Sequence, residues 1–286
     1  MGGAIPVQKR LFPDQRIAGC EIIVGDALAI LQEFPAHTFR CCVTSPPYWG
    51  LRDYGISTQI GSEANLEDYI ANLREIFREV FRVLAGDGTL WLNIGDSYTS
   101  GNRTWRAGDR KNPARAMTYR PPTPEGLKSK DLVGVPWRVA FALQEDGWYL
   151  RSDIIWYKPN CQPESVKDRP TRAHEYIFLF SKSEKYFYDY EAVRELSNTN
   201  GGYRNRRTVW EVNTESFPEA HFATFPPRLV EPCILAGSEP GDSVLDPFFG
   251  SGTVGEVCVK LRRRFTGIEI KEEYARLARK RLGWER

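Results

Sequence analysis

A short segment, TSPPYWGLRDY at residues 44–54, gathers groups that could grip a planar amine. It follows an apolar run typical of a β-strand, and its two prolines end that strand because they lack a backbone N–H and hold the chain extended. Ser45 then offers a hydroxyl, the Pro46 carbonyl stands without a strand partner, and Tyr48 offers a flat face. Two acceptors beside a stacking surface would orient an exocyclic NH₂ and aim its lone pair at a methyl donor. A proline-rich exit from a strand, with its aromatics in the core, is the alternative interpretation.

A second segment, SVLDPFFGSGTV, is typical of a nucleoside-binding turn. Asp246 ends a predicted strand, Gly250 and Gly252 let the backbone approach a ligand, and a helix begins near Thr253. Seventeen residues after Gly252, Glu269 ends the next predicted strand, where a carboxylate suits the two ribose hydroxyls of an adenosine. The third glycine of a dinucleotide site and the lysine of a P-loop are both missing, so we expect a cofactor that carries adenosine without phosphates.

The elements that would position these segments follow an α/β pattern. Residues 66–84 place apolar side chains at the 3.6-residue period of an amphipathic helix, which the glycines at 86 and 88 would end. Predicted strands alternate with predicted helices, which indicates a mostly parallel, doubly wound sheet covered on both faces. We expect strands at 21–24, 39–44, 89–95, 148–159, 175–183, 242–246 and 264–270, and helices at 27–34, 66–84, 136–147, 228–237, 254–263 and 272–282.

Composition limits the partners of the chain. Its 286 residues suit one large domain or a core with an inserted lobe, and the net charge of +2 is nearly balanced. Residues 99–130 differ, because eight basic side chains stand against two acidic ones in a stretch without periodicity. This local charge of +6 suits contacts with a polyanion. A solvated insertion is the alternative.

Targeting signals and cysteine pairs are not evident. The amino terminus lacks the apolar core of a secretory signal, and no run approaches the roughly 20 apolar residues of a membrane span. The six cysteines form no C-x-x-C pair and have no nearby histidine, so we expect neither a metal site nor disulfides. A cytoplasmic protein, encoded by a prokaryote or a phage, is the expectation.

Several ordered motifs carry a family resemblance. TSPPY resembles the catalytic signature of the DNA amino-methyltransferases, which use S-adenosylmethionine, and DPFFGSGT resembles their cofactor signature. The catalytic motif precedes the cofactor motif, which is similar to the permuted β class. HFATFP at 221–226 resembles the segment that closes over the cofactor, GDAL at 25–28 resembles the acidic turn near its adenine, and LWLNIGD and IIWYKPN resemble later strands of the family.

The resemblance implies a Rossmann-like methyltransferase fold that uses S-adenosylmethionine and acts on double-stranded DNA. A base inside a duplex must be flipped out before its amine can react. Serine before the two prolines is typical of cytosine-N4 enzymes, whereas adenine-N6 enzymes mostly carry Asp or Asn there. The implied catalytic residues are Ser45, Pro46, Pro47 and Tyr48. The implied cofactor-binding residues are Asp26, Thr224, Phe225, Pro226, Asp246, Phe248, Gly250, Gly252, Thr253 and Glu269.

The same resemblance divides the chain. Residues 1–98 are interpreted as the catalytic half of the core, 99–130 as a basic flexible loop, 131–160 as core, 161–207 as the embedded target-recognition region, and 208–286 as the cofactor-binding half. The side chains expected to contact DNA are Trp49, Arg52, Arg103, Arg106, Arg110, Lys111, Arg115, Arg120, Arg204, Arg206 and Arg207. Trp49 could instead belong to the core, and Arg52 could pair with Asp53.

Other functions are less compatible with the residues. Cytosine C5 methylation needs a cysteine thiolate, but Cys233 follows Pro232 inside a predicted helix and suits the core. His174 and His221 are better interpreted as structural, because solvent can take the proton from a methylated amine. A DNA-binding relative without turnover and a methyltransferase for small-molecule or protein amines remain as alternatives. A cognate restriction endonuclease is a possible partner, and the protein could be a monomer or a homodimer.

Overall fold

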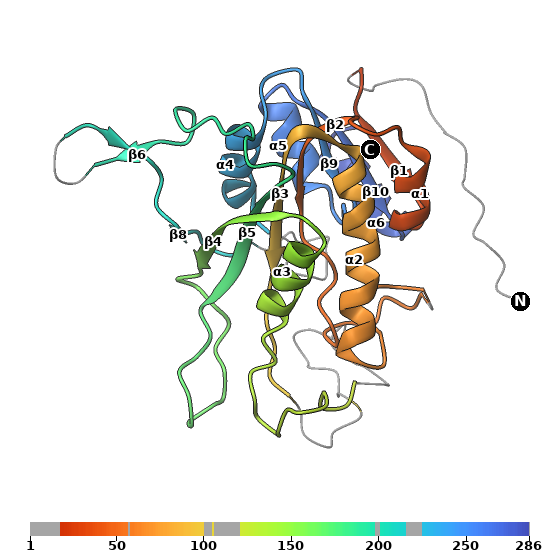
Figure 1. Ribbon diagram of the computed structural model, residues 1–286, viewed down its shortest axis with the longest axis vertical. Coiled ribbons are helices and arrows are strands. Elements are labelled where there is room, and N and C mark those ends of the chain that lie inside the picture. Colours follow the sequence, from red (N-terminus) through yellow and green to blue (C-terminus); the bar gives the residue numbers. More distant parts are fainter. Residues whose placement is uncertain are drawn as a thin grey trace, which may run out of the picture.

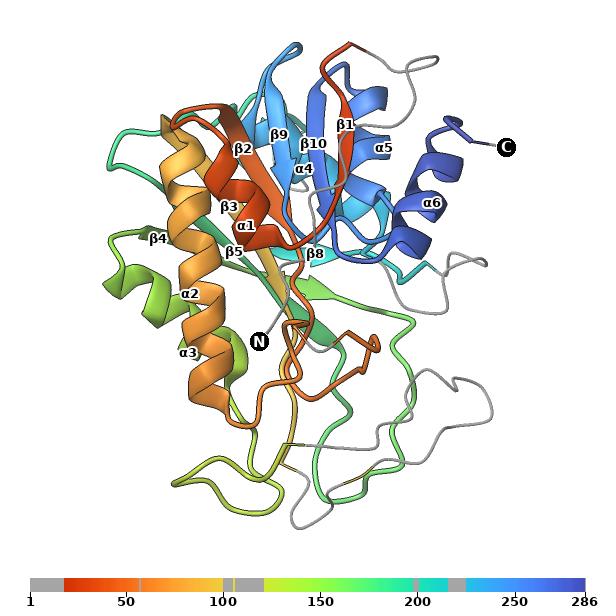
Figure 2. The same ribbon diagram turned by 90° about the vertical axis from the view of Figure 1, so that its right-hand side faces the viewer.

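The computed structural model describes residues 18–56, 58–99, 105, 121–197, 201–215 and 225–285. Helices cover both faces of one eight-stranded sheet (Figures 1 and 2). In sheet order the strands are β1 (Glu21–Val24), β10 (Arg264–Glu269), β9 (Ser243–Asp246), β2 (Phe39–Thr44), β3 (Leu84–Ile94), β5 (His174–Ser181), β4 (Tyr149–Tyr157) and β8 (Val209–Glu211). A separate hairpin pairs β6 (Glu195–Leu196) with β7 (Tyr203–Arg204) and projects from the body in Figure 1.

Strand direction explains how distant motifs meet. From β1 to β3 every neighbouring pair is parallel, and β4 pairs in parallel with β8. The strand between β3 and β4, β5, is antiparallel to both. Because carboxyl ends of parallel strands share one edge, the segments that follow β1, β2, β3, β4, β9 and β10 gather there. The antiparallel β5 brings its amino-terminal end to the same edge.

Two apolar layers fix the helices against the sheet. On one face lie α1 (Ala27–Glu33), α2 (Leu66–Val83) and α3 (Val135–Glu145). On the other lie α4 (Pro227–Gly237), α5 (Thr253–Lys260) and α6 (Glu272–Arg281). Figure 2 separates these two groups clearly. The predicted doubly wound α/β fold is therefore confirmed, and none of the helices in the described ranges is long and apolar enough to cross a membrane.

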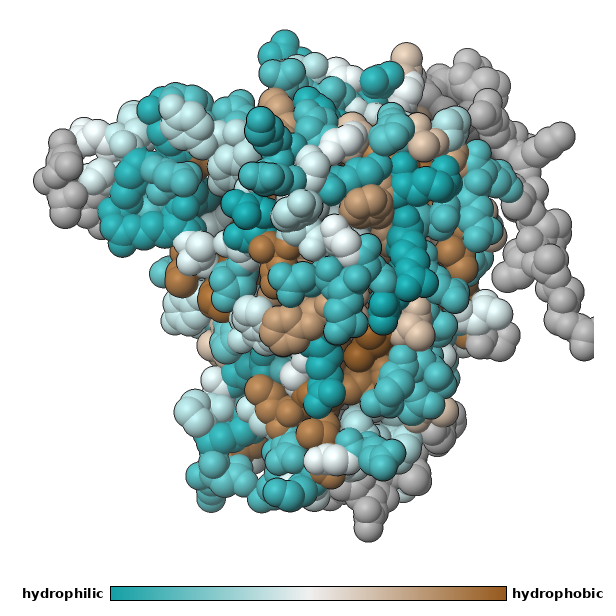
Figure 3. Space-filling model, in the orientation of Figure 1, coloured by the Kyte–Doolittle hydropathy of each residue, from teal (hydrophilic) through white to brown (hydrophobic). Residues whose placement is uncertain are grey.

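The face shown in Figure 3 is largely hydrophilic, and hydrophobic residues are exposed on it over α3. Phe141 of that helix is 52% exposed and lies against Trp137, with ring centroids 5.6 Å apart. Single exposed apolar side chains of this kind are common on protein surfaces.

The end of the long helix differs from the prediction. α2 stops at Val83, and β3 begins at Leu84 and runs through both glycines that were expected to end the helix. The register between β2 and β3 shifts at this place, and a Cβ at Gly88 would lie 3.0 Å from the Arg40 carbonyl. The glycines thus permit an irregularity in the strand rather than a helix-ending turn.

The proposed target-recognition range also changes. β5 lies inside 161–207 and is a buried central strand, so that part of the range belongs to the core. The segments on either side of β5, including the β6–β7 hairpin, lie outside the sheet. Strands of two or three residues such as β6, β7 and β8 were not predicted, because so short a run shows no alternation.

Candidate active site

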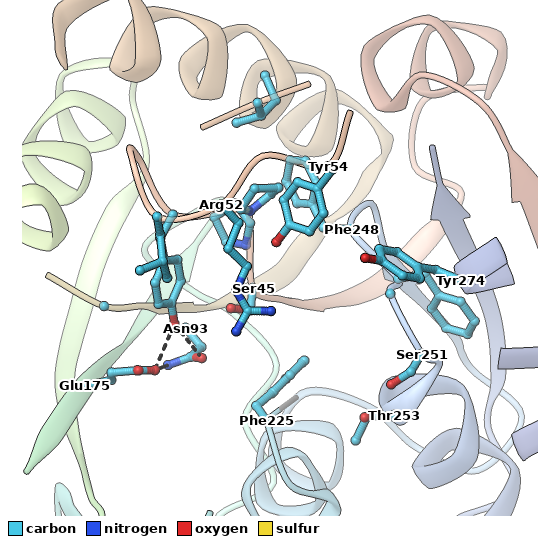
Figure 4. Close-up of a pocket in the computed structure, with 18 of the residues that line it drawn as sticks. Ser45, Arg52, Tyr54, Asn93, Glu175, Phe225, Phe248, Ser251, Thr253 and Tyr274 are labelled. Atoms are coloured by element: carbon cyan, nitrogen blue, oxygen red, sulfur yellow. Dashed lines mark hydrogen bonds between the residues drawn. The ribbon is translucent and has the colours of Figure 1, made fainter. Parts of the chain in front are cut away.

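One cavity of about 680 Å³ opens at the shared strand edge and is lined by both motifs (Figure 4). Most of the predicted catalytic and cofactor residues meet in its wall. These are Asp26, Ser45, Pro46, Pro47, Tyr48, Phe225, Phe248, Gly250, Thr253 and Glu269. The lining residues do not include Asp246, Gly252 or Pro226. Thr224 and His221 lie outside the described residues.

The glycine turn after β9 is held from both sides. The Thr44 hydroxyl at the end of β2 donates to Asp246 Oδ1 at 2.6 Å, and the Phe248 N–H donates to the same oxygen at 3.1 Å. Gly252 has a φ of +82°, and a Cβ there would lie 2.8 Å from Ala278 Cβ in α6. Only glycine fits this position without strain, which explains the G-x-G spacing in physical terms.

Glu269 ends β10 as a buried acceptor. Its Oε2 accepts from the Gly250 N–H at 2.8 Å, and its Oε1 accepts from the Lys271 N–H at 2.9 Å. Burial raises the pKa of this carboxyl to about 7, against its hydrogen bonds from the two N–H groups, which lower it. Each oxygen keeps a further lone pair, so the carboxylate can also accept from a pair of hydroxyls.

The rest of this half suits a nucleoside. Asp26 follows β1 and caps α1, accepting from the Ala29 N–H at 3.0 Å. Figure 4 places Phe248, Tyr274 and Tyr54 around one end of the cavity, and Phe225 at its side. A buried carboxylate between aromatic side chains matches the ribose and adenine of S-adenosylmethionine, so the residues present fit that cofactor.

The other half of the cavity is built around Tyr48. Its hydroxyl lies 2.8 Å from Glu175 Oε2 and 3.3 Å from Asn93 Oδ1, the contacts dashed in Figure 4. The Tyr69 hydroxyl of α2 donates to the Pro47 carbonyl at 2.9 Å. The β2–β3 ladder ends at Thr44, so Ser45 and Pro46 stand beyond it. The stiff corner is therefore anchored at its base and open toward the cavity.

Glu175 and Lys158 are functional candidates that sequence reasoning missed. They form an ion pair at the cavity wall, and the Lys158 ammonium lies 4.0 Å from the centroid of the Trp156 ring. Glu175 reaches the site only because β5 runs antiparallel to β3 and β4. The IIWYKPN resemblance was the only signal for Lys158, and it assigned no role to the side chain.

Comparison with known proteins decides the family. The family model for N6 and N4 methyltransferases, described as DNA methylase, matches residues 39–280. The chain belongs to this DNA methylase family. It is 63% identical over 270 residues to the Type II methyltransferase M.SmaI of Serratia marcescens, covering 94% of this chain and 92% of the relative. It is 64% identical over 267 residues to M.Cfr9I of Citrobacter freundii, covering 93% and 89%.

Solved structures agree with the fold of the methylase. The cytosine-N4-specific PvuII DNA methyltransferase superposes with a TM-score of 0.69 at 22% identity, over 92% of this chain and 86% of that one. A putative DNA modification methylase from Thermus thermophilus, solved with S-adenosylmethionine, gives 0.64 at 26% identity, over 92% and 93%. The predicted fold and the predicted cofactor, S-adenosylmethionine, are confirmed.

The structure places the residues that were expected to contact DNA in different environments. Trp49 is only 6% exposed and donates from its indole to the Glu63 carbonyl at 3.1 Å, so it is a core residue and not part of the pocket mouth. Arg52 lies in the cavity wall and points into the cavity (Figure 4). Arg103, Arg106, Arg110, Lys111, Arg115 and Arg120 lie outside the described residues.

The three arginines near the hairpin are also distinguishable. Arg204 pairs with Glu195 at 2.9 Å, and Arg206 lies over the Trp210 ring at 4.7 Å. Arg207 is 3.8 Å from Glu195, and its side chain is 65% exposed. Of the three, Arg207 is the most available to a phosphate.

The thiol candidate lies in the core, whereas the imidazole candidate His174 lies at the cavity. Cys233 is 2% exposed, and its Sγ contacts the Leu229 carbonyl at 3.5 Å inside α4. Burial raises its pKa well above the ordinary value, which suppresses the thiolate. His174 lines the cavity, and burial together with Arg172 and Lys158 lowers its pKa.

Gly95 of the methylase leaves room for the Tyr48 ring. A Cβ at this position would lie 2.6 Å from Tyr48 Cε2 and 3.3 Å from the Glu175 carboxyl carbon. Gly95→Ala is therefore expected to displace the ring and to lower the rate of DNA methylation by about tenfold or more, a cost of at least ~1.4 kcal/mol. Affinity for S-adenosylmethionine, measured by calorimetry, should stay within about threefold.

Gly86→Ala is the matched control for this substitution, because a Cβ at Gly86 meets no atom within 4 Å. Equal activity of the Gly95 variant and the control would contradict a fixed position for the Tyr48 ring.

Proposed function

We propose that the methylase transfers a methyl group to the exocyclic N4 amine of a cytosine flipped out of duplex DNA at a specific site. The observation that carries this proposal is Ser45, whose hydroxyl stands with the Pro46 carbonyl beyond the end of the strand ladder and lines the cavity that also contains the cofactor half. Serine before the two prolines favours cytosine over adenine, as the family resemblance implies.

The residues of the protein bind and orient the target base. When bound, S-adenosylmethionine supplies an electrophilic methyl group on a sulfonium. Ser45 and Pro46 accept hydrogen bonds from the two N–H groups of the amine, which fixes its orientation and directs its lone pair toward the cofactor half. Tyr48 covers the base, and stacking of this kind is worth about 1 to 3 kcal/mol, which offsets part of the cost of flipping.

Direct transfer to an amine needs no enzyme thiol. Cys161, on the turn after β4, lines the cavity, so it offers a sharp test of this statement. Cys161→Ser is expected to keep its methylation rate within about twofold, measured as labelled methyl incorporated into DNA. A loss of a hundredfold or more would point to a covalent intermediate and to ring-carbon chemistry instead.

The names of the relatives support a proposal for the biological setting. Those at 62–64% identity are all named Type II methyltransferases and come from bacteria. We propose that this methylase likewise modifies one short recognition sequence and protects it against a cognate restriction endonuclease. The segments on either side of β5 and the basic stretch within 99–130 are the proposed DNA-contacting parts.

Arg207 provides a test of the DNA-binding surface. Arg207→Ala is expected to weaken DNA binding nearly uniformly across sequences and to reduce the slope of log affinity against log salt by about 1, because one phosphate contact is lost. Arg276→Ala is the control, since Arg276 is 69% exposed and pairs with Glu272 at 3.6 Å, much as Arg207 pairs with Glu195. Fluorescence anisotropy over a salt series measures both, and identical slopes for the two variants would remove Arg207 from the interface.

Modified-base sequencing tests the proposed function in a cell. The methylase is expressed in a bacterial host that lacks its own DNA methyltransferases, and the host genome is sequenced with a method that distinguishes methylated bases. We expect N4-methylcytosine at one position of one short sequence. N6-methyladenine at a single sequence would replace the proposal with adenine methylation on the same scaffold.

A further inference from the structure

We propose that Ser45, Tyr48 and Glu175 form a hydrogen-bonded chain that makes Ser45 an acceptor for the target amine and receives the proton which the methylated amine sheds. This inference rests on the proposed function, since it concerns the same amine. It adds Glu175 and Lys158 to the site and gives the Tyr48 hydroxyl a role besides stacking.

The middle of the chain is set by the single proton of the Tyr48 hydroxyl. Glu175 Oε2 is the nearer acceptor at 2.8 Å, against 3.3 Å for Asn93 Oδ1. The Asn93 amide is oriented by its own donor, which contacts the Tyr176 carbonyl at 3.1 Å and Glu175 Oε2 at 3.3 Å. The Tyr48 proton is therefore directed at the Glu175 carboxylate, and the Tyr48 oxygen can only accept from any other neighbour.

We take Ser45 as that other neighbour, because its side chain lies in the same cavity wall and acts to lower the pKa of Tyr48, as a donor to the Tyr48 oxygen would. Because the Tyr48 oxygen can only accept, Ser45 is the donor in this contact. Its lone pairs then remain for a group in the cavity that both residues line. An NH₂ group needs an acceptor of this kind, and Pro46 provides a second one. Burial and Glu175 raise the pKa of Tyr48 well above its ordinary value, so it stays protonated and transmits a proton rather than acting as a base.

Lys158 contacts Glu175, the last residue of the hydrogen-bonded chain. Its ammonium pairs with Glu175 Oε1, and it also lies over the Trp156 ring at 4.0 Å. The side chains of Lys158 and Glu175 are 15% and 18% exposed, so the pair is largely removed from water. Because the Lys158 ammonium occupies Oε1, Oε2 is left to accept from the Tyr48 hydroxyl.

The proton balance closes within these residues. The amine nitrogen uses its lone pair to bond the methyl carbon, while the bond between that carbon and the sulfonium sulfur breaks and leaves its electron pair on the sulfur. The nitrogen becomes positively charged and still carries two protons. One moves to Ser45 Oγ as the Ser45 proton moves to Tyr48 and the Tyr48 proton moves to Glu175 Oε2. This leaves a neutral methylated amine, two unchanged hydroxyls and a neutral Glu175. Glu175 then releases the proton to solvent, which restores the carboxylate.

Tyr48→Phe tests the chain with the smallest change, because the ring remains and Glu175 keeps its pairing with Lys158. We expect the single-turnover rate of methyl transfer to fall about 10- to 100-fold, at the lower end of general acid–base effects. The Michaelis constant for DNA, the affinity for S-adenosylmethionine and the fluorescence of 2-aminopurine at the target position should match the wild type, because capture of the base is unchanged.

Tyr149→Phe is the control, since Tyr149 is 45% exposed on β4 and outside the cavity wall. A wild-type transfer rate in Tyr48→Phe would overturn the proposal.

A double-mutant cycle that combines Tyr48→Phe with Glu175→Gln tests whether the residues act together through hydrogen bonds or act independently. If the three groups act as one unit, the double variant should be no more than about threefold slower than the slower single variant, since the chain is already broken. Effects that multiply would contradict the proposal. Circular dichroism melting of each variant confirms that it is folded.

Failure of the proposed function would give a different result. The wild-type protein would methylate adenine, while the double-mutant cycle would still show coupling between Tyr48 and Glu175.

Discussion

Glu269→Ala is expected to lower the affinity of the methylase for S-adenosylmethionine by roughly 10²- to 10⁴-fold. The carboxylate would accept from two ribose hydroxyls, and each hydrogen bond to a charged group contributes about 1.5 to 3 kcal/mol. The substitution also removes the acceptor of the Gly250 and Lys271 N–H groups, which shape the turn around the cofactor. Isothermal calorimetry measures the affinity directly, and a change of less than about fivefold would contradict the assignment of Glu269.

The same carboxyl predicts how cofactor binding depends on pH. Burial raises the pKa of Glu269 from its ordinary 4.5 to about 7, so the group is protonated below that pH and ionised above it. Hydroxyl donors favour the ionised form, and affinity should therefore rise as the pH increases through about 7. The stability of the cofactor-free protein should change with pH in the opposite direction to the cofactor affinity. The contribution of Glu269 to the free energy of unfolding is fully present below about pH 4.5 and is lost as the pH rises through about 7.

Glu269→Gln separates charge from shape in this prediction. Glutamine keeps the size of the side chain and one acceptor oxygen, but it does not titrate. Its affinity for the cofactor should be lower than that of the wild type at pH 8 and should show a weaker dependence on pH between 6 and 8. An unchanged pH profile would assign the titration to another group, such as Asp246, whose pKa burial also raises to about 7.

Ser45→Ala is the second prediction with a large expected effect. It removes one of the two acceptors that orient the amine, and loss of one aligned hydrogen-bonding group at a reacting centre costs about 10²- to 10³-fold in kcat. Cofactor affinity should be unchanged, because Ser45 belongs to the base half of the cavity. Rapid-quench measurement of labelled methyl transfer gives the rate of the chemical step without product release.

Ser183→Ala is the control for the loss of a serine hydroxyl. Ser183 follows β5 at the end of the strand opposite to Glu175, and its hydroxyl donates to the Lys185 carbonyl. A rate for Ser45→Ala within threefold of this control would mean that Pro46 and the base stack alone orient the amine.

The sequence was sufficient for the parts of the site that depend on local spacing. The turn from Asp246 to Thr253 and the corner from Ser45 to Tyr48 are continuous segments, and their glycines and prolines state the required backbone directly. Parallel strands then bring the segments together, so that a prediction of the sheet was enough to place both at one edge.

Glu175 and Lys158 could not be found in that way. Their contact depends on the antiparallel direction of β5, which pairs Glu175 with Trp156 across the ladder and turns its side chain toward Tyr48. Periodicity identifies a strand but not its direction, because both directions bury the same residues. For Trp49 the sequence could not decide between two positions. An aromatic residue after a catalytic motif suits a core and a pocket equally well, and only its neighbours in the fold distinguish them.

The most direct test of the central claim is nucleoside mass spectrometry of DNA treated with purified methylase and S-adenosylmethionine. Mixed-sequence duplex DNA is digested to nucleosides after reaction, beside a reaction with Ser45→Ala. The account predicts N4-methylcytosine in the wild-type reaction, with the yield reduced by about two orders of magnitude in the variant under initial-rate conditions. N6-methyladenine or 5-methylcytosine as the product of the wild-type protein would contradict it.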